Sequence, residues 1–352
     1  MKSYAVCQCG APLEPREEPT PNPTGTEVLL RVLAAGVCHS DLHFWEGVYD
    51  LGSGRQLKLT ERGMTLPLTM GHETVGEVVA LGPEARGVAI GERRLAYPWI
   101  GCGACKVCQR GDEQLCLKPR FLGVFRPGGY SEYLLVPHPR YLFDCGSIPP
   151  EQAAPLACSG VTAYGALRKL GGLLQTEPIV IIGAGGLGLM GLAILKSLGG
   201  FGAIVLDIDP AKREAARQAG AIASIDAKAP DAVKQITDAA NGGVWGAIDF
   251  VGSSSTVQLG IDCLTKGGKL IVVGLFGGEV TVPTPFIPIK AMTLQGSYTG
   301  SLSELKELID LVRSAPLPLI PVRRRPLEEA TAALTDLKDG KVIGRVVLAP
   351  AG

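Results

Sequence analysis

The stretch that decides the fold reads IVIIGAGGLGLMG and spans residues 179–191. Four consecutive apolar residues run into glycines spaced G-x-G-x-x-G, and a helical apolar pattern follows them. This order of strand, glycine-rich turn and helix is typical of the first turn of a doubly wound parallel sheet. Its glycines let the backbone approach a pyrophosphate, which the helix N-terminus binds. The sequence therefore predicts a dinucleotide site at Gly183, Gly185, Gly186, Leu187 and Gly188.

An acidic residue ends the next predicted strand, AIVLD (203–207), and a helical segment follows it. A carboxylate at Asp207 would accept both ribose hydroxyls and repel a 2′-phosphate, which favours NAD over NADP. Lys212 lies where it could reach the adenosine ribose, while Arg213 leaves NADP use open. The alternative interpretation is a glycine-rich structural turn without a nucleotide.

The strand–helix alternation continues as far as residue 298, whereas the chain before residue 155 has a different pattern. Four more apolar runs, AIASID, AIDFVG, KLIVVGL and MTLQGSY, bring the predicted parallel strands to six, the number in a complete doubly wound sheet. The first half instead alternates short β-like runs with turns rich in Pro, Gly and Asp. Near the end, GRVVLAP (344–350) is predicted to return to this first part as a strand. The fold class is α/β, with a β-rich domain and a doubly wound parallel-sheet domain.

Composition excludes several classes of partner. The 352 residues contain 34 Lys plus Arg and 34 Asp plus Glu, a balance that argues against nucleic-acid or anionic-membrane surfaces. No apolar run has the length of a signal peptide or of a membrane span. These features favour a cytoplasmic protein, in which thiols stay reduced.

Four cysteines crowd into GCGACKVCQRGDEQLC (101–116), at Cys102, Cys105, Cys108 and Cys116. The spacing C-x2-C-x2-C-x7-C departs from that of bacterial ferredoxins at the fourth cysteine. Four thiolates in one loop suit a closed tetrahedral zinc site that is structural, because no position is left for substrate. An iron–sulfur cluster and four unligated thiols are the alternatives.

A second set of metal-ligand types is dispersed along the chain. GVCHSDLH (36–43) contains Cys38, MGHETVGE contains His72 next to Glu73, and PLACSGVTAYG contains Cys158. One His and two Cys would leave a fourth position open on zinc, as in catalytic sites. Spacing alone does not bring these residues together, and a lone Cys or His is more often structural.

The motifs GVCHSDLH, GHE, the four-Cys loop, CSGVTAYG, GAGGLG with Asp207, VVGLFG and GKVIGR follow one another in an order that resembles the zinc-dependent medium-chain alcohol dehydrogenases. The chain is most similar to their archaeal and bacterial NAD-dependent tetrameric type, along almost its whole length. The resemblance implies a GroES-like catalytic domain at residues 1–156 and 297–352 and a Rossmann domain at 157–296. It also implies two zinc ions per subunit, one catalytic and one structural, and a homo-oligomer, either tetramer or dimer.

Site roles follow from the same resemblance. Cys38, His72 and Cys158 would bind the catalytic zinc, with Asp41 orienting His72 and Glu73 able to approach the metal. Ser40 corresponds to the hydroxyl that contacts the substrate alcohol, and His43 to the relay histidine that passes its proton to water. The remaining cofactor positions are His39, Thr162, Val273, Leu275 and Arg345, and the pocket walls are Trp45 and Trp99.

The implied reaction is reversible hydride transfer between a primary or secondary alcohol and NAD, giving an aldehyde or ketone. Two related enzyme classes are alternatives: a polyol dehydrogenase, which usually lacks a Cys at the third ligand position, and a zinc-free quinone or enone reductase. A third alternative is a zinc-stapled nucleotide-binding protein without activity. Residues 48–69 are longer than in yeast-type enzymes and are implied to lie near the pocket mouth, so the sequence does not name the alcohol.

Overall fold

The computed structural model describes residues 1–315, 317–318 and 320–351. One of its two main sheets contains six parallel strands in the order β13-β12-β11-β14-β15-β16. This confirms the six strands that the sequence predicts. The strands are β11 (Ile179–Ile182), β12 (Ala203–Asp207), β13 (Ala223–Asp226), β14 (Val244–Asp249), β15 (Leu264–Val272) and β16 (Thr293–Gly296).

Both faces of the central strands of this sheet are buried, because successive residues of these strands enter different cores. On β11, Ile179 and Ile181 join the core beneath α4 and α6, whereas Val180 and Ile182 join the core beneath α8 and α9. Apolar residues at every position of a strand are what a sheet covered on both faces requires. The helices of this unit are α4 (Ser159–Arg168), α5 (Leu173–Thr176), α6 (Gly186–Ser197), α7 (Pro210–Gln218), α8 (Ala232–Ala239), α9 (Ser254–Cys263) and α10 (Phe286–Lys290).

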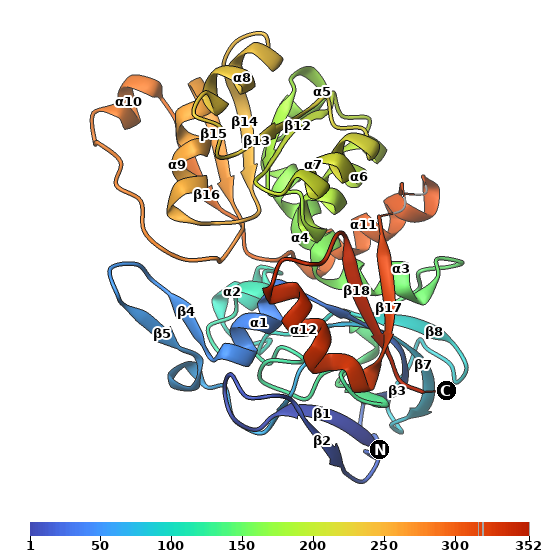
Figure 1. The fold of residues 1–352 in the computed structure, drawn as a ribbon. Helices are drawn as coiled ribbons and strands as arrows, with labels where there is room; N and C mark the ends of the chain where they lie inside the picture. Colours follow the sequence, from blue (N-terminus) through green and yellow to red (C-terminus); the bar gives the residue numbers. More distant parts are fainter. Residues whose placement is uncertain (316, 319, 352) are drawn as a thin grey trace.

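The second main sheet is built from both ends of the chain, with the path β10-β8-β7-β3-β18-β17 and β9 paired to β3. Smaller pairings are β2-β1-β6 and the hairpin β4-β5. The N-terminal strands are β1 (Lys2–Val6), β2 (Glu14–Glu17), β3 (Val28–Val37), β4 (Val48–Asp50), β5 (Gln56–Lys58), β6 (Leu68–Thr69), β7 (Glu73–Leu81), β8 (Arg93–Ala96), β9 (Tyr133–Val136) and β10 (Leu142–Phe143). This β-rich unit and the parallel-sheet unit are the two lobes seen in Figure 1, and they confirm the predicted fold class.

Short helices connect the strands of the β-rich unit. They are the α-helices α1 (His39–Glu46), α2 (Lys106–Gln109) and α3 (Pro150–Ala153), and the 3-10 helices η1 (Leu59–Arg62), η2 (Glu113–Leu115), η3 (Pro139–Tyr141) and η4 (Ala154–Ala157). α1 starts directly after β3 and ends at Gly47, whose φ of 76° is left-handed and suits glycine. Ser40 and His43 therefore both lie on α1.

The end of the chain returns to the β-rich unit, as the sequence predicts. α11 (Leu302–Ser314) contacts α4, and β17 (Val322–Pro326), η5 (Leu327–Glu329) and α12 (Ala330–Lys338) follow. β18 (Arg345–Ala349) then inserts between β17 and β3, pairing Val347 with Gly36. The two ends of the chain thus complete one sheet.

Within the described part of the chain, no helix is both long enough and apolar enough to cross a membrane.

Candidate functional site

Four buried side chains from separate segments meet where the two units join. Cys38 caps α1, His72 and Glu73 lie at the start of β7, and Cys158 precedes α4. One ligand atom of each lies within 4.8 Å of the others. The sheet brings Cys38 close to His72 and Glu73, because β3 pairs with β7 in a register that sets Gly36 opposite Glu73. The structure therefore brings together the dispersed residues that spacing alone could not.

Asp41 fixes the orientation of the histidine in this cluster by a side-chain contact. Its Oδ1 lies 3.0 Å from Nδ1 of His72, and its Oδ2 accepts hydrogen bonds from the backbone N–H of Cys38 at 2.9 Å and the hydroxyl of Tyr130 at 3.0 Å. Asp41 is fully buried. A carboxylate that accepts from Nδ1–H fixes the tautomer in which the Nε2 lone pair is free.

The donor set fits a metal ion. Nε2 of His72 is buried and has no hydrogen-bond partner among the described residues, which is costly unless a ligand satisfies it. Sγ of Cys38 lies 3.8 Å from Sγ of Cys158. A hydrogen bond from Cys158 and the proximity of His72 and Arg345 lower the pKa of Cys38 well below its usual value, against the effect of burial. Two Cys and one His around a common point suit zinc with one position left open.

Glu73 belongs to the same cluster and forms an ion pair with Arg345, on the returning strand β18. Its Oε1 also accepts a hydrogen bond from the backbone N–H of Ser159 at 3.2 Å. Burial raises the pKa of Glu73 to about 7, although Arg345 opposes the shift. A Cβ at Gly36 would lie 2.0 Å from the Glu73 carboxylate, so only glycine fits at that position.

The four cysteines of the loop 101–116 form the second cluster. Sγ of Cys108 lies 4.0 Å from Sγ of Cys102 and 3.5 Å from Sγ of Cys105, and Sγ of Cys116 lies 3.9 Å from Sγ of Cys105. Four sulfurs about 2.3 Å from one zinc are separated by about 3.8 Å, which matches. A [4Fe–4S] cluster would hold each thiolate on a different iron, and a [2Fe–2S] cluster would hold the thiolates as two separated pairs. The geometry therefore favours a single closed zinc site.

Glu113 ties this loop to the rest of the β-rich unit. Its carboxylate accepts hydrogen bonds from the backbone N–H of Gly101 at 3.0 Å, the hydroxyl of Tyr141 at 2.8 Å and the guanidinium of Arg140 at 2.5 Å. Only 6% of Glu113 is exposed. The role of Glu113 could not be predicted from the sequence, because an acidic residue between two cysteines matches no recognised motif.

The glycine-rich turn has the shape of a phosphate cradle. Gly183 has a left-handed φ of 96°, and a Cβ at Gly188 would lie 1.8 Å from the carbonyl oxygen of Gly183. By contrast, a Cβ at Gly185 would meet nothing within 4 Å, so this residue borders open space at the N-terminus of α6. The free amides and positive end of an α-helix in such a space bind phosphate.

Asp207 lies beside this glycine-rich turn. Its Oδ2 accepts a hydrogen bond from the backbone N–H of Ala184 at 2.8 Å, which fixes the carboxylate beside the turn. Arg213 donates to the carbonyl of Asp207 at 2.9 Å and pairs with Asp226 at 3.2 Å. The guanidinium is therefore already engaged by an acidic residue, which weakens the case for a 2′-phosphate partner.

Other predicted cofactor positions lie around the same edge of the sheet. Partial burial and the charges of Arg345 and Lys212 lower the pKa of His39. Oγ1 of Thr162 is buried without a hydrogen-bond partner among the described residues. Val273 and Leu275 follow the end of β15, and Leu275 is 39% exposed.

The predicted relay residues share helix α1. Ser40 and His43 are one turn apart, so their side chains point to the same side of the helix. The ring of His43 packs on Tyr49, with centroids 4.7 Å apart. Burial, together with the nearby His39, lowers the pKa of His43 below that of a free histidine.

One of the two predicted pocket walls is corrected. Trp99 lies beside the cluster, with its ring centroid 5.2 Å from that of His72. Trp45 faces elsewhere: its indole N–H donates to the carbonyl of Ala11, and the ammonium of Lys338 on α12 lies 5.7 Å from its ring. The aromatic residues of this segment that lie beside the site are instead Phe44, whose ring centroid is 6.0 Å from that of His72, and Tyr49, the neighbour of His43.

Tyr298 is a second aromatic residue beside the site that the sequence analysis did not name. Its ring packs against Trp99 with centroids 6.3 Å apart, and 40% of the residue is exposed. It follows the end of β16 and lies far from Trp99 in the sequence, so no local pattern pairs the two residues. Tyr49, Trp99 and Tyr298 together give the surroundings of the cluster an aromatic character.

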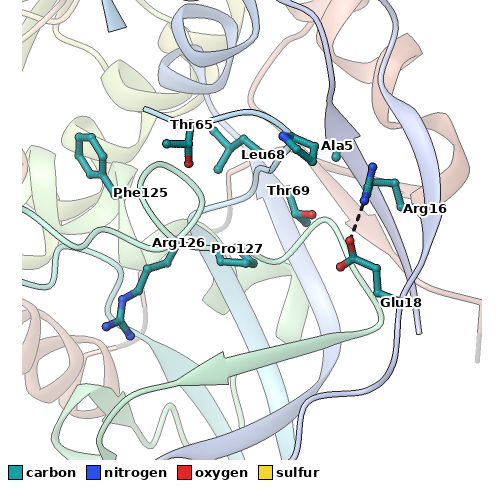
Figure 2. Close-up of a pocket in the computed structure, with 10 residues that line it drawn as sticks. Ala5, Arg16, Glu18, Thr65, Leu68, Thr69, Phe125, Arg126 and Pro127 are labelled. Atoms are coloured by element: carbon teal, nitrogen blue, oxygen red, sulfur yellow. Dashed lines mark hydrogen bonds and ion pairs between the residues drawn. The ribbon is translucent and has the colours of Figure 1, made fainter. Parts of the chain in front are cut away.

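A separate surface hollow of about 110 Å³ lies between the N-terminal strands and the loop around Phe125, where Arg16 pairs with Glu18 (Figure 2). None of its lining residues belongs to either cysteine cluster or to the glycine-rich turn. It has no part in the chemistry described above.

Comparison with known proteins agrees with this geometry. Residues 24–147 match the alcohol dehydrogenase GroES-like domain, and residues 186–314 match the zinc-binding dehydrogenase domain. The NAD-dependent alcohol dehydrogenase of Sulfurisphaera tokodaii is 37% identical over 99% of this chain and 100% of its own length. That of Saccharolobus solfataricus is 36% identical, also over 99% of this chain and 100% of its own length. The crystal structure of the alcohol dehydrogenase from Aeropyrum pernix superposes with a TM-score of 0.89, at 32% identity over 99% of this chain and 100% of that one. The chain therefore belongs to the zinc-binding, medium-chain family of alcohol dehydrogenases.

Proposed function

We propose that this protein is a zinc-dependent oxidoreductase that transfers a hydride reversibly between a primary or secondary alcohol and NAD. The observation that carries the proposal is the unpartnered Nε2 of His72, buried in a cluster with the thiols of Cys38 and Cys158. A zinc-free reductase would have no use for such a donor set. When bound, zinc would supply a Lewis acid that lowers the pKa of an alcohol, and NAD would accept the hydride.

The chain's own residues position the reactants and move the proton. Asp41 keeps His72 in the tautomer that ligates, and Arg345 keeps Glu73 within the cluster. Ser40 would accept the proton of the alcohol and pass it along α1 toward His43, which is neutral at physiological pH because its pKa is lowered. Trp99, Tyr49 and Tyr298 would exclude water from the reacting carbon and favour apolar alcohols.

NAD would lie along the carboxyl edge of the parallel sheet. The turn with Gly183, Gly185 and Gly188 and the basic groups of His39 and Arg345 would hold the pyrophosphate, and Lys212 would reach the adenosine ribose. Asp207 would hold the adenosine ribose. Thr162, Val273 and Leu275 would contact the nicotinamide. Support comes from the open space at Gly185 and the unpartnered Oγ1 of Thr162.

We assign a structural zinc to Cys102, Cys105, Cys108 and Cys116. Backbone N–H groups of Ala104 and Cys105 lower the pKa of Cys102, which favours the thiolate needed for ligation. With all four positions filled by protein, this site has no place for substrate.

We also propose a division of the chain into a catalytic domain, residues 1–156 and 297–352, and a nucleotide domain, residues 157–296. The insertion of β18 beside β3 supports the assignment of the C-terminal segment. The six cysteines of the two clusters require reducing conditions for metal binding, which supports a cytoplasmic location.

We further propose that the protein forms a homo-oligomer, either a tetramer or a dimer. β16 is an edge strand of the parallel sheet, and apolar side chains are exposed on it and on the preceding helix. Phe286 is 52% exposed, Ile289 59% and Leu294 47%. Exposed apolar groups along a free sheet edge are typical of a surface that another subunit covers.

The test of the function measures NADH formation from a panel of primary, secondary, cyclic and aromatic alcohols, with NAD and NADP in parallel and zinc content determined on the same sample. We expect two zinc ions per subunit and turnover with NAD. One zinc or none, with turnover of quinones or enones only, would refute the proposal.

A further inference from the structure

The hairpin formed by β4 and β5 joins the two units. Its base follows α1 at Gly47, and Tyr49 on β4 packs against His43. Its tip, residues 51–55, reaches the loop that follows β15 in the parallel-sheet unit, as Figure 1 shows. This hairpin lies within residues 48–69, the segment whose role the sequence left open.

The tip contacts Glu279 of that loop through side chains and backbone. The guanidinium of Arg55 lies 3.1 Å from the Glu279 carboxylate, and the hydroxyl of Ser53 donates to the same carboxylate. Gly52 is buried here, and a Cβ on it would lie 3.0 Å from the backbone nitrogen of Glu279. The close approach therefore depends on a residue without a side chain.

The loop is itself fixed to the carboxyl edge of the sheet. Glu279 donates its backbone N–H to Oγ of Ser254 at 3.0 Å, and Gly277 donates to the carbonyl of Gly252 at 3.1 Å. A Cβ at Gly277 would lie 2.8 Å from Asp50 of the hairpin, so this second contact is also close. The hairpin therefore contacts a loop that is itself hydrogen-bonded to the parallel-sheet unit.

From these contacts we infer that the hairpin is a clasp between the two units, in which Gly52, Arg55 and Glu279 are positioning residues that slow the release of the nicotinamide cofactor. The inference rests on the proposed function. One end of the hairpin lies on the relay histidine, and the other lies on the loop after Val273 and Leu275. Opening of the units must therefore break the contacts with Glu279 before a nucleotide between them can leave.

Two glycines of the hairpin provide a matched pair of variants. Gly52 and Gly54 both have left-handed φ, 81° and 73°, so alanine strains the backbone at either position. Only at Gly52 does the added methyl group meet Glu279, because a Cβ at Gly54 has nothing within 4 Å. Glu279→Gln has a similar control in Glu77→Gln, which breaks an exposed Arg–Glu pair within one sheet.

The experiment follows NADH release by stopped flow, as fluorescence loss after mixing with excess NAD. We expect release about two- to fivefold faster in Glu279→Gln, because an exposed pair contributes little, and about fivefold or more in Gly52→Ala. Gly54→Ala and Glu77→Gln should stay within about twofold of the parent. Arg55→Glu combined with Glu279→Arg should restore slow release.

Hydrogen exchange of the hairpin amides in the cofactor-free protein gives a second measurement. Exchange of residues 48–58 should be faster in Gly52→Ala than in Gly54→Ala. Equal exchange and equal NADH release in this pair would overturn the clasp while leaving the proposed function intact. A parent protein that binds no NADH would overturn the proposed function, and with it the role of the clasp in cofactor release.

Discussion

The carboxylate of Asp41 contacts two residues of the metal-ligand cluster at once, with one oxygen 3.0 Å from Nδ1 of His72 and the other 2.9 Å from the backbone nitrogen of Cys38. A single buried side chain thus sets the orientation of an imidazole and the start of the helix that presents a thiol. The geometry of the cluster depends on this residue, although it donates no atom to the metal.

Asp41→Asn should therefore weaken zinc binding at the catalytic site by about ten- to a hundredfold, because the amide does not hold the same tautomer. Zinc affinity is measured by competition with a chelator. Asp249→Asn is the control, since Asp249 is also buried and hydrogen-bonded but lies in the other unit. Parent-like zinc affinity in Asp41→Asn would contradict the assigned role.

The two cysteine clusters should respond differently to mutation. Cys38→Ser should abolish turnover in a protein that still folds, with one zinc lost per subunit. Cys102→Ser should instead lower the melting temperature or disturb assembly, since structural zinc contributes directly to folding. Metal analysis, calorimetry and activity on the same samples separate the outcomes. Complete loss of activity in a folded, assembled Cys102→Ser protein would show that the structural assignment is wrong.

His43→Gln should lower turnover about a hundredfold at pH 6–7 and less at higher pH, where hydroxide or buffer replaces the base. The lowered pKa of His43 means that the neutral, proton-accepting form persists to a lower pH than in free histidine. Parent activity should accordingly fall only as the pH drops through this lowered pKa. Full pH profiles of turnover test the idea. A uniform loss at all pH values, with weaker NAD binding, would favour a bracing role instead.

Asp207→Gly should weaken NAD binding and improve NADP use, because it removes both the ribose acceptor and the repulsion of a 2′-phosphate. Asp226→Asn is the matched control, since it releases Arg213 but leaves the carboxylate at 207 in place. Titration with both cofactors should show retained NAD affinity only in the control. A parent protein that already prefers NADP would refute the assignment.

Gly185→Ala and Gly188→Ala should separate cofactor binding from folding. The methyl group at 188 would clash with the carbonyl of Gly183, so this variant should lose about 1–3 kcal/mol of stability or more. The methyl group at 185 enters open space, so that variant should melt like the parent but bind NAD more weakly. Thermal unfolding and NAD titration give the two readouts, and equal effects in both variants would argue against the cradle.

The sequence predicted the elements whose signal is local. Ile179–Ile182 reads as a strand because every position is apolar, and the glycines after it fix the turn. Cys102 and Cys116 lie in one loop, so their meeting needs only the loop to close. His72 and Cys158 could be paired only through resemblance, because strand register and the junction of the units bring them together.

What the sequence missed depends on contacts between distant segments. Trp45 and Tyr49 are both aromatic residues close to His43 in sequence, but Tyr49 packs against His43 whereas Trp45 hydrogen-bonds the carbonyl of Ala11. Tyr298 packs against Trp99 although the two residues are far apart in the sequence. The contact of Arg55 with Glu279 joins residues more than two hundred positions apart, and neither lies in a recognisable motif.

The insertion of β18 between β3 and β17 has a consequence for the order in which the molecule is made. β18 is synthesised after the other described strands of this sheet, yet it lies in the interior of the sheet. The parallel-sheet unit is continuous in sequence and can fold during synthesis, as domains generally do. Until β18 is made, the N-terminal part of the chain has no partner strand on that side of β3, and Glu73 lacks its ion pair with Arg345. The reactive centre therefore stays incomplete until β18, which follows the parallel-sheet unit in sequence, has been made.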